Sequence, residues 1–131
     1  MKDQIAHYEN KLNNETDSYD QWESITLGEG IVVVDARSAE TDAERHIPGT
    51  VNIPHRTMDH ESTADLNNDS LYVTYCDGIG CNASTKGALN MARLGFNAKE
   101  LMGGLDWCMR DGYETEGLQP TEGRAMVCGC G

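Results

Sequence analysis

Hydrophobic residues fall into short runs that are separated by polar and glycine-rich stretches. Residues 31–34 are all β-branched and show no alternation, which predicts a central strand covered on both faces. Residues 71–75 predict a second strand, and shorter strands are expected over 51–53 and 99–102. Buried strands of this kind need helices on both faces of a parallel sheet.

Helical spacing fills the segments between these strands. Residues 2–11 predict a short helix, and Tyr19, Trp22 and Ile25 mark a second one, capped by Asp17 or Ser18. Residues 38–45 are polar and tolerate a helix, residues 84–94 predict a longer one that Gly95 closes, and 105–110 predict the last. The alternation favours an α/β class with a mainly parallel central sheet.

The length of 131 residues suits one domain. We divide it into an N-terminal helical segment (1–30), a core (31–113) and a C-terminal tail (114–131). The opening is polar and no apolar run reaches membrane-spanning length, so we expect a cytoplasmic protein without a secretory signal. The net charge of −12 argues against nucleic acid and membrane partners.

Two of the five cysteines lie in a glycine-bearing loop between a predicted strand and a predicted helix. Cys76 is the first residue after strand 71–75, where parallel sheets place their ligands. If Ser84 begins the next helix, backbone N–H groups can converge on the sulfur and stabilise a reactive thiolate. The alternative is that Cys76 is a small apolar residue that ends a buried strand.

Two motifs in this order resemble the rhodanese-like domains. The first reads VVVDARSAETDAERHIPGTVNIPH, and the second reads YVTYCDGIGCNASTKGALNMARLGFNAKELMGGLDWC. The resemblance runs from about residue 31 to residue 113. It implies that Cys76 accepts a sulfane sulfur from a small donor or a persulfide-carrying protein and passes it to a thiol acceptor, without a cofactor or a metal. The anion-binding loop would comprise Asp77, Gly78, Ile79, Gly80, Cys81, Asn82, Ala83 and Ser84.

The loop departs from the family pattern in its missing Arg, its length and its second cysteine, Cys81. Many active members carry an Arg before the helix serine, where this chain has Ala83, and the loop is about two residues longer. Asp77 adds a negative charge beside the nucleophile, so thiosulfate loses its counter-charge unless Lys86 partly replaces the Arg. Phosphatase and arsenate-reducing activities, which need that Arg, are disfavoured.

The other four cysteines and one charged pair are also candidates for a functional or structural role. Cys81 is either a resolving thiol for Cys76 or a tolerated loop residue. Cys108 follows Trp107 in the last helix, and both are expected to pack against the sheet. Cys128 and Cys130 could accept sulfur, form a redox pair, contribute to a zinc site or have no role. Supporting roles fall to Asp35 and Arg37, an expected structural pair.

The sequence thus favours a sulfurtransferase that acts through a Cys76 persulfide. A binding or redox-sensing module that uses Cys76 and Cys81 on the same fold is the main alternative. A structural zinc protein built on the cysteines is the third hypothesis.

Overall fold

The computed structural model describes residues 1–121, and its centre is a five-stranded sheet of parallel strands in the order β1-β5-β4-β2-β3. The strands are β1 (Glu15–Thr16), β2 (Ile31–Asp35), β3 (Val51–Asn52), β4 (Leu71–Tyr75) and β5 (Asn97–Leu101). The predicted α/β class with a mainly parallel sheet is therefore confirmed.

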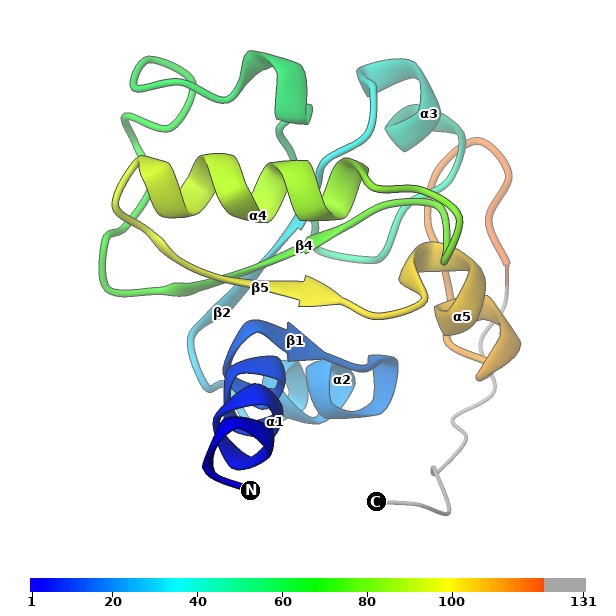
Figure 1. Ribbon diagram of the computed structural model, residues 1–131. Helices are drawn as coiled ribbons and strands as arrows, with labels where there is room; N and C mark the ends of the chain where they lie inside the picture. The colour runs from blue at the N-terminus through cyan, green and yellow to red at the C-terminus, as the bar shows by residue number, and fades with distance from the viewer. Residues whose placement is uncertain (122–131) are drawn as a thin grey trace.

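Helices cover both faces of the sheet (Figure 1). On one face lie α4 (Ala83–Arg93) and the short 3-10 helix η1 (His55–Thr57), and on the other lie α2 (Ser18–Thr26) and α5 (Gly104–Arg110). The helix α1 (Lys2–Asn14) contacts β1 and β5 at one edge, and α3 (Ala39–Glu44) follows β2. The helices predicted around residues 2–11, 18–25, 38–45, 84–94 and 105–110 are all present.

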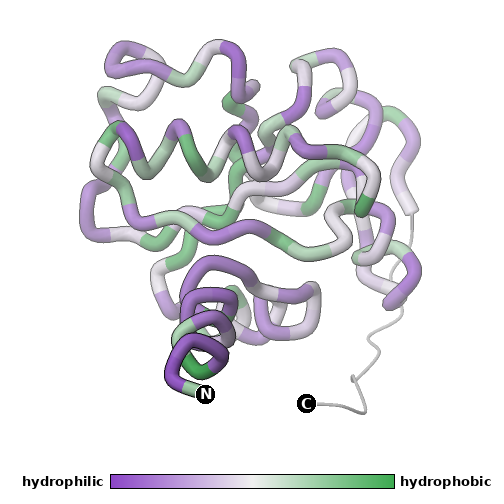
Figure 2. The backbone as a smooth tube through the Cα atoms, in the orientation of Figure 1, coloured by the Kyte–Doolittle hydropathy of each residue, from purple (hydrophilic) through white to green (hydrophobic). Residues whose placement is uncertain are grey.

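Two hydrophobic clusters hold these layers together, because successive side chains of a strand point to opposite faces. Toward α4 the buried members are Val34, Ile53, Tyr72, Met91 and Phe96. Toward α5 they are Val33, Ile47, Val73, Tyr75, Leu101, Leu105 and Cys108. Figure 2 shows the contrast with α1, which is largely hydrophilic and has no buried residue. The strands β2 and β4 therefore form the core on which the loops at their carboxyl ends are held.

Several local predictions were wrong in detail. The strand predicted over 99–102 begins two residues earlier, and neither β1 nor η1 was predicted, since two or three residues carry no periodicity. In α2 two of the residues whose spacing predicted the helix are exposed, at 41% for Trp22 and 45% for Ile25. The buried residues of α2 are Ser18 and Gln21, while the Trp22 ring lies 5.9 Å from the ring of Tyr113.

Candidate functional site

The loop of residues 76–82 joins the end of β4 to the start of α4 at the carboxyl edge of the sheet. Cys76 directly follows β4 and is only 1% exposed. Its carbonyl oxygen accepts a hydrogen bond from the N–H of Leu105 at 2.9 Å, and the carbonyl of Asp77 accepts one from the N–H of Asp106 at 2.7 Å. The first turn of α5 therefore fixes the position of Cys76 behind the loop.

This contact between α5 and the loop depends on a glycine. Gly104 has a φ of +58°, and a Cβ atom there would lie 2.3 Å from the carbonyl oxygen of Cys76 and 3.0 Å from the nitrogen of Gly78. The two backbones can approach this closely only without a side chain. The Gly-Gly sequence before the last helix thus supports the loop directly.

A disulfide joins Cys76 to Cys81, with a distance of 6.2 Å between the two Cα atoms. The backbone between them turns through a hydrogen bond from the N–H of Cys81 to the carbonyl of Gly78 at 3.2 Å. The middle of this loop is exposed to solvent, because Ile79 is 81% exposed and a Cβ at Gly80 would have no neighbour within 4 Å. Cys81 is half-buried, so the two sulfur-bearing residues differ in their access to solvent. In this state Cys76 has no free thiol and must be reduced before it can act as a nucleophile.

The start of α4 faces the loop, as the sequence predicted. Asn82 is the N-cap residue and forms no side-chain cap, so the first-turn N–H groups have no partner from that side chain. Ser84 is buried and donates to Glu100 Oε1 at 3.3 Å, and Thr85 donates to the same oxygen at 2.5 Å. A carboxylate on β5 therefore lies against the positive end of this helix.

A buried ion pair supports the other side of the loop. Arg37 contacts Asp35 through Nε (2.9 Å) and one terminal nitrogen (2.7 Å), and its other terminal nitrogen contacts Asp77 at 2.8 Å. It also donates to the carbonyl of Arg45 at 2.6 Å, while Tyr75 Oη donates to Asp35 at 3.1 Å. Burial alone would lower the pKa of Arg37, but the hydrogen bonds that it donates to the carboxylates of Asp35 and Asp77 outweigh this effect and raise the pKa. Arg37 therefore stays charged and neutralises Asp77, the residue next to Cys76.

Lys86 lies on α4 with its side chain exposed, near enough to His55 to affect its charge. Burial, together with Lys86 and Arg56, lowers the pKa of His55. Arg37 is occupied by its carboxylates. Neither cation therefore takes the place of the loop Arg next to Cys76 in the contacts that the described residues form.

One pocket lies directly beside the disulfide. It has a volume of about 440 Å³ and is called the loop pocket here. Cys81 lines it and Cys76 does not; the other lining residues are Glu15, Asp17, Gly78, Ile79, Ser84, Thr85, Glu100, Leu101, Met102, Gly103 and Trp107. The prediction that Trp107 packs against the sheet was wrong, because its side chain is 43% exposed at this pocket. The carboxylates and Trp107 were not predicted as site residues, and no local motif marks them.

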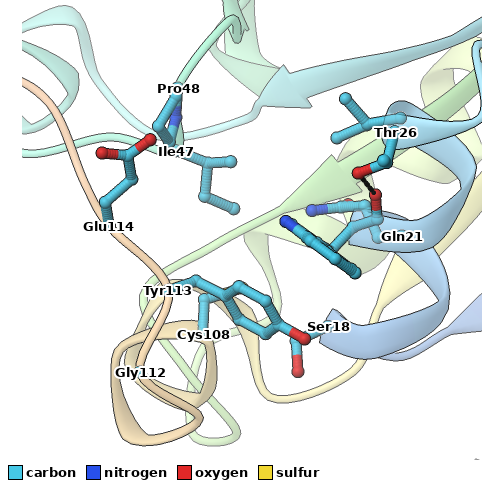
Figure 3. Close-up of a pocket in the computed structure, with 11 residues that line it drawn as sticks. Ser18, Gln21, Thr26, Ile47, Pro48, Cys108, Gly112, Tyr113 and Glu114 are labelled. Carbon is cyan, nitrogen blue, oxygen red and sulfur yellow. Dashed lines mark hydrogen bonds between the residues drawn. The ribbon is translucent and has the colours of Figure 1, made fainter. Parts of the chain in front are cut away.

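A second pocket, of about 380 Å³, lies between α2 and α5 (Figure 3). Ser18, Gln21 and Thr26 from α2 face Ile47, Tyr113 and Cys108 across it. Cys108 is buried as predicted, and burial with the nearby Asp111 raises the pKa of its thiol to about 12. The thiol is therefore protonated and unreactive at neutral pH.

Two findings concern metals and membranes. Within residues 1–121, no three or more His, Cys, Asp or Glu side chains gather where they could hold a metal ion. Over the same residues, no helix has the length and apolar character needed to cross a membrane. Cys128 and Cys130 lie outside the described residues, so their predicted roles stay predictions.

The fold and the loop together define a family. The rhodanese-like domain family matches residues 18–110, and the chain belongs to it. Its structure is similar to that of the BH2092 protein from Bacillus halodurans, with 37% identity over 98% of this chain and 95% of that one and a TM-score of 0.88.

More distant structures share the fold. A rhodanese-related protein from Thermoplasma volcanium is 24% identical, with a TM-score of 0.68 over 81% of this chain and 99% of the other. A rhodanese-like domain protein from Staphylococcus aureus is 21% identical, with a TM-score of 0.64 over 72% of this chain and 90% of the other. No curated protein matches the chain.

Proposed function

We propose that this protein is a sulfurtransferase in which Cys76 carries a sulfane sulfur as a persulfide. The observation that carries the proposal is the position of Cys76 in a rhodanese-like chain, at the end of β4 and in front of the first turn of α4. Unpaired N–H groups at a helix start stabilise an anionic sulfur, which favours both the thiolate and the persulfide. The same geometry would stabilise the developing charge during transfer.

The transfer has two balanced steps, which follow once Cys76 is reduced. The Cys76 thiolate attacks the sulfane sulfur of a donor, an S–S bond forms, and the donor leaves as its thiolate or, from thiosulfate, as sulfite. An acceptor thiolate then attacks the outer sulfur of the Cys76 persulfide and takes it, and the Cys76 thiolate is restored. Neither step requires a cofactor.

The charges around the loop favour a persulfide donor over thiosulfate. Arg37 is already held by Asp35 and Asp77, and Ala83 stands where an Arg would bind a dianion. The loop pocket adds further carboxylates. A doubly charged anion would therefore meet repulsion near the sulfur, and Arg37, which is already paired, would offset little of it.

The disulfide supports a second function, in redox sensing or in the release of sulfide. The Cys81 thiolate can attack the inner sulfur of a Cys76 persulfide, which forms the Cys76–Cys81 disulfide and expels hydrosulfide. The same disulfide would form if Cys81 attacked a Cys76 sulfenate, with hydroxide as the leaving group. In both cases the loop closes into the state that the structure contains.

Intact mass spectrometry of the full chain tests both functions. Protein reduced with dithiothreitol and desalted is exposed to thiosulfate or to a low-molecular-weight persulfide. We expect Cys81→Ser to gain about 32 Da at Cys76 with the persulfide, since it cannot resolve the adduct. The wild type should instead return to the disulfide, with a loss of two hydrogens and release of sulfide.

Two variants serve as controls, with the modified cysteine identified by peptide mapping. Cys76→Ser should show neither change in the loop, whereas Cys108→Ser should behave as the wild type, because the Cys108 thiol is buried. If Cys81→Ser gains no sulfur at Cys76 from any donor, the sulfurtransferase proposal is wrong. If the wild type nevertheless forms the disulfide with peroxide, redox sensing becomes the better interpretation.

A further inference from the structure

The two ends of the Cys76–Cys81 disulfide differ in accessibility. Cys76 is 1% exposed and is held from behind by α5, whose Leu105 N–H bonds to its carbonyl at 2.9 Å. Cys81 is half-buried and lines the loop pocket of about 440 Å³. A thiolate that opens a disulfide approaches along the S–S axis, from the side opposite the leaving sulfur. Of the two cysteines, Cys81 borders the loop pocket, from which a small thiol can approach it.

The chemistry of the leaving group favours the same direction. Attack on Cys81 expels the Cys76 sulfur, and under the proposed function Cys76 is the cysteine whose thiolate is stabilised, which makes it the better leaving group. Attack on Cys76 would instead expel the Cys81 sulfur at the edge of a pocket that carries negative charge. Access and leaving-group stability therefore agree.

The charge of the loop pocket restricts which thiol can enter. Glu15, Asp17 and Glu100 line it, and among residues 1–121 no Lys, Arg or His does. One of these carboxylates, Glu15, is paired with Lys11 of α1 at 2.9 Å. Glu100 accepts hydrogen bonds only from hydroxyl groups in the contacts described above, so its charge is not neutralised by a cation there.

The apolar residues that line the loop pocket suit the short alkyl chain of a small thiol. Leu101, Met102 and Trp107 supply apolar surface beside the carboxylates. A small thiol that carries an ammonium group could place its stem on this surface and its charge among the carboxylates. An anionic thiol of the same size would be repelled.

We infer that the loop disulfide is opened by a small cationic thiol that enters the loop pocket, attacks Cys81 and releases the Cys76 thiolate. The attacking thiolate forms a mixed disulfide with Cys81, and the electron pair of the broken bond leaves on Cys76. A second thiol then attacks the small-molecule sulfur of the mixed disulfide, which frees Cys81 and yields the oxidised small disulfide. This inference rests on the proposed function, because it names the reductant class that returns Cys76 to its active form.

The first test identifies the sulfur that is attacked. The oxidised full-length protein is mixed with cysteamine and quenched with excess N-ethylmaleimide within the first turnover. Fragmentation of the peptide that contains both cysteines should show cysteamine on Cys81 and N-ethylmaleimide on Cys76. The opposite placement of the two labels would overturn the inference.

The second test measures charge selection. Rate constants for opening the disulfide are compared for cysteamine, 2-mercaptoethanol and 2-mercaptoethanesulfonate, each divided by its rate with a small neutral disulfide to remove differences in thiol reactivity. We expect cysteamine to exceed the sulfonate by roughly tenfold at low ionic strength, with the ratio approaching unity at about 1 M salt. Equal or reversed rates at low salt would refute the selection.

A matched pair of variants assigns the effect to the loop pocket. Glu100→Gln removes one charge and keeps an oxygen for the hydroxyls of Ser84 and Thr85, so the cysteamine preference should fall by severalfold. Glu61→Gln removes one exposed carboxylate outside the loop pocket and should leave the ratio unchanged. Equal effects of both would mean that the net charge of −12, and not the pocket, selects the thiol.

The tests of disulfide opening can fail independently of the test of persulfide formation. Persulfide formation is measured on protein already reduced with dithiothreitol, where the direction of disulfide opening has no influence. Sulfur gain at Cys76 together with attack at Cys76, or with no charge preference, would refute only the present inference.

Discussion

The contact between Gly104 and the carbonyl of Cys76 should make Gly104→Ala one of the most damaging small substitutions in this protein. An alanine Cβ would lie 2.3 Å from that oxygen, 3.0 Å from the Gly78 nitrogen and 3.1 Å from the Asp77 carbonyl carbon. All three atoms belong to the backbone, so no side chain can rotate away. The start of α5 must therefore move off the loop.

The expected loss of stability follows from what that movement breaks. A left-handed φ of +58° costs an alanine about 1 kcal/mol relative to glycine. Separating α5 from the loop also weakens the hydrogen bonds from Leu105 N to Cys76 O and from Asp106 N to Asp77 O, at about 1 kcal/mol each. The sum of about 3 kcal/mol is a large share of the stability of a small domain.

Urea unfolding followed by tryptophan fluorescence measures this loss, with two glycine controls. Gly28 has a φ of +67° and no atom within 4 Å of an added Cβ, so Gly28→Ala should cost only about 1 kcal/mol. Gly80 has no such neighbour and no positive φ, so Gly80→Ala should cost close to nothing. The reasoning is refuted if Gly104→Ala and Gly28→Ala lose the same stability, since the close approach would then contribute nothing.

Three further outcomes test the surroundings of the site. Arg37→Met leaves the buried Asp35 unpaired and should lower the unfolding free energy by about 3–5 kcal/mol. Arg110→Met, which removes an exposed ion pair, should cost less than about 1 kcal/mol in the same urea titration. In native reduced protein at about pH 8, iodoacetamide should leave Cys108 unmodified by peptide mapping, because burial raises the pKa of its thiol to about 12. Burial and the nearby Asp35 raise the pKa of Asp42 from 3.8 to about 6, so the native state binds more protons than the unfolded state between these values. The stability that this carboxyl contributes should be lost as pH rises through about 6, and Asp42→Asn should gain on the wild type in urea unfolding between roughly pH 4 and pH 7; a constant difference would contradict this.

Local pattern was enough for most of the secondary structure. The strand over 71–75 and the helix that follows were predicted almost to the residue, because a buried run and a glycine-closed helix are signals contained in neighbouring residues. The prediction failed where position in the fold overrides local preference. Trp22 and Trp107 are both exposed at pockets, since the helices that carry them present smaller residues to the core.

The position of the candidate nucleophile Cys76 could be predicted from the sequence, since a cysteine after a buried strand and before a helix is a local arrangement. The electrostatic surroundings could not, because they come from contacts between residues far apart in the chain. Arg37 reaches Asp77 across 40 positions, and β1 and β5 bring Glu15 and Glu100 to the same pocket. The pairing of parallel strands places these charges around the disulfide, and no spacing along the chain records which charges will meet there.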